Sequence, residues 1–412
     1  MTQSSHLPHF RTWLASLEEE KLATILRNRS DVLNPLPPSI AALATRLLLR
    51  TSIARALMNC TARQLAEIED IARRGGELEE VEDLNPDITR QLKERGLAYG
   101  NVLIPPEVMP ALPTGWSLLD QVQVSPEDIA ELPDEERKVL LTLSRSNGLG
   151  TTRDAAIDAD PARPIPRLIA KQLLQRVDAT TVRLPRAVHL ALNGKPTAPI
   201  PVEGITESPA PDPKADDAGT AAGLSAVRGM QRVIDALGAR PIELLKDKTV
   251  GVRQLTNLSK TLTIDEGELR RLIELGMSAR LLSRGEPKNF EGNFLAPTEL
   301  SQDWLDAGLA EKWQVLLEAW TASPWTKEGR TLAHTNDRLP SFRDKVLQVY
   351  LRGAKPTFEE SLRFHFPLFA THTSDETIAE LRAEAEWIGA IALERPTSVL
   401  ILSLIHISEP TR

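Results

Sequence analysis

Residues 182–192 read VRLPRAVHLAL, and residues 102–112 read VLIPPEVMPAL. In both stretches a three-residue run typical of a strand ends at a proline, and apolar side chains then follow at helical spacing. A helical pattern precedes each stretch, at residues 92–95 in the first copy and 173–176 in the second. We interpret the two as copies of one repeat, in which a helix is followed by a short β-hairpin, a proline and an apolar tail.

A third, weaker copy lies further along the chain. Residues 269–277 form its helix, residues 279–282 and 293–295 its hairpin, and Pro297 ends the unit. The alternative is that three unrelated stretches reached this order by chance. Chance would then have produced the same pattern, with a proline after each hairpin, three times.

The segment before the third hairpin predicts two packed helices. Residues 252–262 place leucines on one face, and Asp265 stands where a helix N-cap is expected, with Glu268 three residues on to complete a capping box. Thr61 and Gln64 predict the same device earlier in the chain. Helices followed by a hairpin make the winged-helix form of the helix-turn-helix. We therefore predict a mainly α fold with small β-hairpins, arranged as tandem winged-helix modules.

Residues 194–223 are rich in proline, alanine and aspartate, so we predict a disordered linker that divides the chain into two halves. The predicted organisation is an N-terminal helical region (1–58), module 1 (59–120), module 2 (121–193), the linker (194–223), module 3 (224–305), a helical region (306–375) and the start of a further module (376–401).

The last residues, 402–412, read LSLIHISEPTR and resemble the in-frame translation of a sequencing adapter. We expect this tail to be foreign to the fold and to pack against nothing, and we expect the natural protein to continue beyond Ile401. An ordinary leucine- and isoleucine-rich tail is the alternative.

The composition excludes several classes of protein. The 412 residues carry a net charge of −8, which argues against a chain that coats nucleic acid or an anionic membrane through its overall field. Cys60 is the single cysteine, so a disulfide framework is excluded, and a reducing cytoplasm is the expected compartment. No apolar run reaches transmembrane length, and residues 1–8 lack the features of a signal peptide. We predict a cytoplasmic protein that does not bind membranes.

No catalytic motif is present in the sequence. Residues 148–152 (GLGTT) lack the lysine of a phosphate-binding loop, and residues 194–197 (GKPT) have a proline where the helix of such a loop would begin. The histidines follow no metal-ligand spacing, and we assign Cys60 to the core. We predict no enzymatic activity, no cofactor, no metal and no small-molecule substrate.

The three candidate recognition helices differ in charge. Residues 86–95 carry three basic and two acidic side chains, whereas residues 265–277 carry two basic and four acidic ones. Residues 161–176 carry four basic side chains and no acid. A helix in the major groove approaches two phosphate backbones, so only the helix of module 2 suits DNA. The predicted DNA-binding residues are Arg163, Arg167, Lys171 and Arg176 of the helix, and Arg183 and Arg186 of the wing. A merely solvated basic face is the alternative.

Four tryptophans, at positions 304, 313, 320 and 325, cluster in the C-terminal half. A stacking platform for single-stranded bases is one interpretation. Leu316, Leu317 and Trp320 follow Trp313 at helical spacing, however, which favours a hydrophobic core.

Several motifs resemble those of the bacterial helicase-associated proteins that carry an XPB-like helicase N-terminal domain. The likeness runs from Phe10 to about Trp387, and its individual motifs are degenerate although their order is specific. The motifs are TVGVRQL (249–255), LTIDE (262–266), LIELG (272–276), TSIARAL (51–57), VRLPR (182–186) and EAEWIG (384–389). The resemblance implies a role in DNA binding or DNA repair beside an XPB-type helicase.

Two functions follow from these observations. The first is a helicase-associated protein that binds DNA weakly through module 2 and acts in repair or transcription. The second is a protein–protein interaction scaffold whose winged helices do not touch DNA, which the acidic net charge favours.

Overall fold

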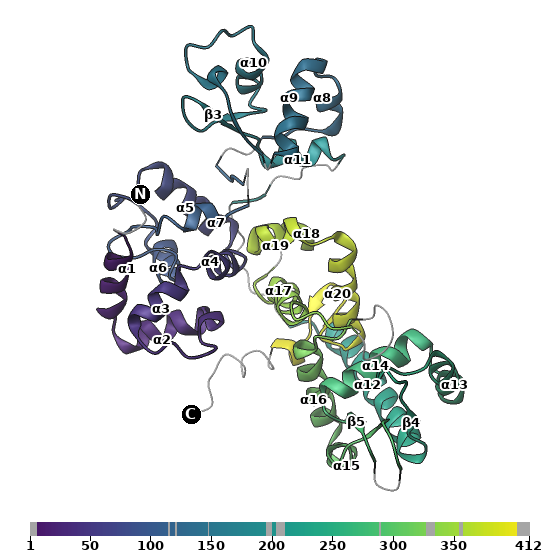
Figure 1. Ribbon diagram of the computed structural model, residues 1–412. Coiled ribbons are helices and arrows are strands. Elements are labelled where there is room, and N and C mark those ends of the chain that lie inside the picture. Colours follow the sequence, from purple (N-terminus) through teal and green to yellow (C-terminus); the bar gives the residue numbers. More distant parts are fainter. Residues whose placement is uncertain are drawn as a thin grey trace. The chain divides into compact units, whose positions relative to one another are not determined.

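The computed structural model describes residues 6–113, 116–119, 122–146, 148–194, 200–202, 211–287, 290–326, 334–353 and 357–401 (Figure 1). It is mainly helical, with 58% helix, 7% strand and small antiparallel sheets, which confirms the predicted fold class at this level. The chain divides into two compact units, and each is described by itself. Unit 1 comprises Met1–Gly204 and Glu359–His372, and unit 2 comprises Ile205–Phe358 and Thr373–Arg412.

The N-terminal part of unit 1 is a helical layer around Phe10, Leu14 and Ile25, all of which are buried. The guanidinium of Arg29 is also buried and donates to the carbonyl oxygens of Leu47 and Arg95, both at 2.9 Å. Arg29 therefore ties this layer to module 1. The elements of the layer are α1 (His6–Ala15), α2 (Glu19–Asn28), η1 (Ser30–Val32) and α3 (Ile40–Leu47).

Module 1 has a core of its own, to which Phe364 and Leu368 from far along the chain also contribute. The capping box of Thr61 and Gln64 is formed as predicted. The elements are α4 (Arg50–Leu57), α5 (Ala62–Arg73), α6 (Pro86–Glu94) and α7 (Val108–Ala111), with α18 (Phe358–His365) and α19 (Pro367–His372).

Module 2 is a small α/β unit packed around Leu140, Leu168, Leu174 and Val182. Its sheet has the order β1-β3-β2, and Val182 of the central strand lies opposite Gly150 and Arg176. The elements are α8 (Pro126–Ala130), α9 (Asp134–Arg145), β1 (Leu149–Thr151), η2 (Arg153–Ala155), α10 (Pro164–Ala170), β2 (Gln175–Arg176), β3 (Thr181–Arg183) and α11 (Arg186–Leu192).

Module 3 has the order that module 2 shows from α9 to β3, with helix α13 in the place of the short segment η2. A helix leads into a first strand, two further helices follow, and a hairpin closes a sheet of order β4-β6-β5, again with the last strand in the centre. Asp265 caps its helix as predicted, accepting from the N–H of Gly267 at 2.8 Å, but the side chain of Glu268 does not bond back to Asp265, so the predicted capping box is only half formed. The elements are α12 (Pro213–Ala239), β4 (Ile242–Glu243), α13 (Val252–Leu262), α14 (Glu266–Ser278), β5 (Leu282–Gly285) and β6 (Phe294–Pro297).

The register predicted for the repeat is wrong in the second copy, because residues 173–176 are not helical. In each copy the helix ends at a left-handed residue, namely Gly96, Gln172 or Arg280. The next residue then donates its N–H back into the helix, from Leu97 to Leu92, from Leu173 to Leu168 and from Leu281 to Gly276. The copies therefore correspond at these helix ends and not at residues 92 and 173.

The linker predicted over 194–223 ends earlier than expected, because α12 begins at Pro213. Proline is favourable in the first turn of a helix, where its missing N–H is not needed. Gly219 and Gly223 are buried, and a Cβ atom on Gly223 would overlap the indole of Trp313. Small residues here permit close helix packing, so their abundance did not indicate a linker in this part of the segment. Residues 195–199 and 203–210 of the predicted linker lie outside the described residues.

The remaining helices of unit 2 bury Trp304, Trp313 and Trp320, which confirms the core interpretation for these three; Trp325 is half-buried. Residues 376–401, predicted to start a further module, pack against α12 within the same unit, and Ser398 bonds to Asp216. The adapter-like tail, 402–412, lies outside the described residues. The elements are α15 (Leu300–Asp306), α16 (Leu309–Ala322), α17 (Leu339–Leu351), α20 (Asp375–Trp387), β7 (Ile391–Ala392) and β8 (Arg395–Pro396).

Candidate nucleic-acid interface

The basic residues predicted to contact DNA lie on or next to α10, on the hairpin that follows it, and, for Arg186, at the start of α11 in module 2. Helix α10 is shorter than the predicted 161–176: it begins at Pro164 and ends at Ala170, since Gln172 turns into the left-handed conformation. Arg163 therefore occupies the N-cap position and Lys171 the C-cap position. Leu168 faces the core, so the cations are left on the outer side of the helix.

The three cations of α10 are paired with acids from elsewhere in the module. Nε of Arg167 lies 2.9 Å from Glu136 Oε1, and Nζ of Lys171 lies 2.7 Å from Glu136 Oε2. Glu136 belongs to α9 and is only 1% exposed, whereas both cations are at least 40% exposed. Arg163 forms an ion pair with Asp154 of η2. One buried carboxylate thus holds two of the predicted DNA contacts in place.

This pairing corrects the predicted charge of the helix. No acid occurs within 161–176, but the folded module brings Glu136 and Asp154 to its cations. Counting the charges along one segment omits the acidic side chains that neighbouring elements bring close to it in the folded protein. The outer face of α10 is consequently much less basic than the sequence alone indicated.

The hairpin arginines have neutral partners instead. Arg176 donates to the carbonyl oxygens of Ala155 and Ala156. Nε and Nη2 of Arg183 both donate to Oε1 of Gln175, at 3.0 and 2.6 Å. Neither partner carries a charge, so both guanidinium groups keep their full attraction for an anion.

Arg186 is the most unusual of the six predicted residues. Its guanidinium carbon lies 5.3 Å from the centre of the Trp116 ring, in a cation–π arrangement. Its Nε is buried and has no hydrogen-bond partner among the described residues. Burial lowers the pKa of Arg186 to about 10, so the group remains protonated at neutral pH. It is a desolvated cation without a carboxylate.

A pocket of about 340 Å³ opens beside Arg186, and Ser144, His189 and His372 also line it. Oγ of Ser144 lies 2.9 Å from Nδ1 of His189, and Nδ1 of His372 lies 2.7 Å from the carbonyl oxygen of Leu368. A guanidinium, two imidazoles and a hydroxyl form a set of donors suited to an oxyanion such as phosphate.

Neither histidine belongs to a metal-ligand spacing in the sequence, and neither was predicted as a site residue. His189 could have been found, since it follows Arg186 by three residues in a helical tail and so shares its face. His372 lies on α19, 183 residues after His189 in the sequence. No pattern in the sequence connects it to Arg186.

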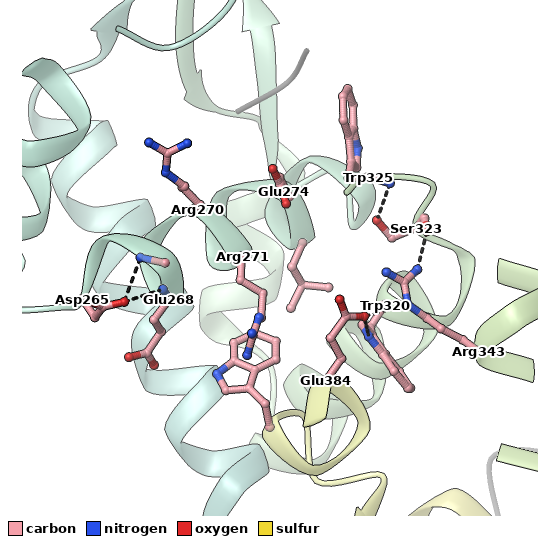
Figure 2. Close-up of a pocket in the computed structure, with 13 residues that line it drawn as sticks. Asp265, Glu268, Arg270, Arg271, Glu274, Trp320, Ser323, Trp325, Arg343 and Glu384 are labelled. Atoms are coloured by element: carbon pink, nitrogen blue, oxygen red, sulfur yellow. Dashed lines mark hydrogen bonds and ion pairs between the residues drawn. The ribbon is translucent and has the colours of Figure 1, made fainter. Parts of the chain in front are cut away.

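The other two candidate recognition helices are less suited to DNA. On α6, Arg90 pairs with Asp87 at 2.9 Å and lies 3.7 Å from Glu94. Helix α14 buries Leu269, Leu272 and Glu274 and packs against α12, α13 and α16, and it carries more acidic than basic side chains. A second pocket, drawn in Figure 2, lies along α14 and is treated below.

Other features of the described residues concern candidate chemistry. Cys60 is fully buried, as predicted for a core residue, and burial raises the pKa of its thiol to about 11. The described ranges contain no group of three or more histidine, cysteine or carboxylate side chains placed to hold a metal ion. Within those ranges no helix combines the length and the apolarity needed to cross a bilayer.

Comparisons with known proteins give no relative: no family model, no curated protein and no solved structure matches this chain.

Proposed function

We propose that this chain is a DNA-binding protein built of winged-helix modules, and that module 2 makes the contact. The connectivity of the two sheet-containing modules supports the first part. In both, a helix, a strand, two helical segments and a hairpin follow in order, and the last strand pairs with the other two. That order is the one expected when a helix-turn-helix carries a β-wing.

The observation that carries the proposal is the uncompensated charge on the hairpin of module 2 and on Arg186, the first residue of the helix after it. Among the described residues, Arg176, Arg183 and Arg186 have neutral partners, while the cations of α10 are paired with acids. Arginine binds phosphate through paired N–H groups, and such contacts position a protein on the duplex. The wing, and not the helix, is therefore the principal phosphate-binding element in this proposal.

The overall charge makes the proposed binding weak and dependent on salt. A net charge of −8 repels the duplex at long range, so only the local field of the hairpin attracts it. Backbone contacts of this kind carry no sequence information, and we propose binding without strong sequence preference.

The helicase association rests on the resemblance of the motifs alone. We propose that the protein acts beside an XPB-type helicase in DNA repair or transcription, in the cytoplasm, without catalytic activity of its own in this stretch of chain.

A specific observation favours the scaffold as a second candidate. In module 3 the helix that would enter the groove is packed against α16, so this module is suited to protein contact. If module 2 also fails to bind DNA, the scaffold becomes the better explanation of the whole chain.

The test is fluorescence anisotropy with duplex and forked DNA across a salt series. The variants Arg183→Gln and Arg186→Gln each remove one proposed phosphate contact. Each should flatten the slope of log K against log salt by about 0.9 on duplex DNA. Arg90→Gln in module 1 is the matched control, because Arg90 is exposed and already paired with acids. Loss of binding in the control alone, or no binding by the unaltered protein at low salt, would overturn the proposal.

A further inference from the structure

The second pocket lies within unit 2 and has a volume of about 500 Å³ (Figure 2). Side chains from α14, α16, α17 and α20 line it, together with Trp325, which follows α16. Its polar and aromatic lining consists of Asp265, Glu268, Arg270, Arg271, Glu274, Trp320, Ser323, Trp325, Arg343, Glu384 and Trp387. None of the DNA-binding residues proposed above belongs to it.

One side of this pocket shows how it already binds a guanidinium group. Arg343 is 3% exposed, and its guanidinium carbon lies 5.6 Å from the centre of the Trp320 ring. Oε2 of Glu384 accepts from Nε of Arg343 at 3.0 Å and from Nε1 of Trp320 at 3.1 Å. An indole face and a carboxylate thus hold one planar cation. Arg271 makes the aromatic part of this arrangement, since its guanidinium carbon lies 4.9 Å from the centre of the Trp387 ring.

Glu274 is the most buried carboxyl group in the described lining of the pocket. Its residue is 9% exposed, and its carboxylate has no hydrogen-bond or ion-pair partner among the described residues. A buried carboxyl group without a partner is unfavourable in its ionised form. The charged groups that face it are Glu384 of α20, Arg270 and Arg271 of α14 and Arg343 of α17.

The pKa of Glu274 reflects this environment. Burial, and then the nearby charge of Glu384, raises the pKa to about 8, although the three arginines act in the opposite direction. Below pH 8 the carboxyl group is therefore mainly protonated. A cation bound next to it would favour the ionised form and release the proton to solvent.

The charge of the lining indicates the sign of the ligand. Four carboxyl groups and three guanidinium groups line the pocket, so one negative charge is in excess when all are ionised. Arg343 is engaged by Glu384, Arg271 lies against Trp387, and Arg270 also has a partner. Among the described residues, the carboxyl group of Glu274 is therefore the buried charge-bearing group of the lining that has no hydrogen-bond or ion-pair partner. A cation, and not a phosphate, is the complementary ligand.

We propose that this pocket binds the guanidinium group of an arginine from a partner polypeptide, through the carboxyl group of Glu274 and the indole of Trp325. Trp325 is half-buried and lines the cavity, as Trp320 does on the occupied side (Figure 2). The site would repeat with an external arginine the arrangement that the protein makes with Arg343. It is independent of the proposed DNA contact, which lies in unit 1.

The test uses the full chain and a blocked pentapeptide, Gly-Gly-Arg-Gly-Gly, in isothermal titration calorimetry at pH 7. We expect saturable binding, and we expect the peptides with lysine or citrulline in place of arginine to bind at least tenfold more weakly. Titration in two buffers of different ionisation enthalpy should show the release of close to one proton per peptide bound. Equal binding of the citrulline peptide would overturn the proposal, because citrulline is planar but uncharged.

Matched variants separate a direct contact from the general field of the pocket. Glu274→Gln should weaken binding at least tenfold and abolish the proton release. Glu268→Gln removes the same charge from the same lining and should change the affinity less than threefold. Trp325→Leu should weaken binding more than Trp325→Phe, which keeps a ring. Equal effects of the two glutamate variants, or the absence of saturable peptide binding by the unaltered protein, would refute the assignment. DNA affinity should stay unchanged in all four variants, so failure here is distinguishable from failure of the proposed function.

Discussion

Modules 2 and 3 share one connectivity but differ in what surrounds the helix before the hairpin. In module 2 this helix, α10, has seven residues and keeps its basic side chains at the surface. In module 3 the corresponding helix, α14, has 13 residues and buries six of them. The comparison teaches that connectivity alone does not specify a binding face. The elements that pack around the helix decide whether it remains open to a ligand.

The helix that precedes the first strand of each module differs in the same sense. Helix α9 has 12 residues and serves only its own module, whereas α12 has 27 residues and also packs against α16, α20 and β7. Module 3 is thereby embedded in a larger helical unit. Module 2 is the better candidate for an external ligand, and module 3 for a structural role.

The largest effect that we predict concerns the buried carboxylate of module 2. The double substitution Arg167→Ala and Lys171→Ala removes both cations from Glu136 and leaves a charge that is 1% exposed without a partner. We expect module 2 to lose about 2–3 kcal/mol of unfolding free energy, below the usual cost for a fully buried pair because both cations are partly exposed. Hydrogen exchange of the β1–β3 amides in the full chain measures this loss.

Adding Glu136→Gln to that double variant provides the control. The glutamine has no charge to satisfy, so most of the lost stability should return. If the triple variant is no more stable than the double one, packing and not charge accounts for the effect. In that case a loss of DNA binding by the double variant would reflect disturbed packing of module 2. It could not be assigned to lost phosphate contacts.

A second, smaller effect tests the embedding of module 3. Gly223→Ala places a methyl group against the indole of Trp313, whose Nε1 donates to the carbonyl oxygen of Ile388 at 2.8 Å. We expect a loss of about 2 kcal/mol in the unfolding free energy of unit 2, measured by chemical denaturation. Gly238→Ala in the same helix meets nothing closer than 3.8 Å and should be neutral or slightly stabilising. A neutral Gly223→Ala would mean that residues 213–223 form a linker after all.

A third prediction concerns the pH dependence of unit 2. Glu274 has a pKa raised to about 8 in the folded protein, against an ordinary value of 4.5. The folded state therefore binds the proton more tightly, so the contribution is fully present at low pH and is lost as pH rises through 8. Between pH 6 and 7 the unfolding free energy should fall by about 1 kcal/mol. Glu274→Gln should remove this slope in denaturation curves, and a steeper slope in the variant would contradict the assignment.

The sequence predicted local features better than distant contacts. The caps formed by Thr61 and Asp265 were correct because a cap depends on residues within one helical turn. The charge of α10 was misjudged because Glu136 lies 31 residues before Arg167 in the sequence. The start of α12 was missed because Gly219 and Gly223 have no side chain to signal burial; only the distant Trp313 and Thr397 make them necessary. His372 was missed because it lies far from Arg186 in the sequence, and only the fold brings the two side chains to one pocket.

The smallest predicted effect is the response of DNA binding to substitutions in module 3. Arg271 lies against Trp387, and Arg270 already has a partner, so neither is available to a phosphate in the way that Arg183 and Arg186 are. The double variant Arg270→Gln and Arg271→Gln should therefore change the DNA affinity less than twofold and leave the salt slope within about 0.3 of the original. The double variant Arg183→Gln and Arg186→Gln should flatten the slope by nearly 2 in the same assay. If the module 3 variant flattens the slope and the module 2 variant does not, the roles of the two modules are reversed. If both variants lose binding equally, the hairpin does not distinguish the modules, and the field of the whole chain must supply the attraction.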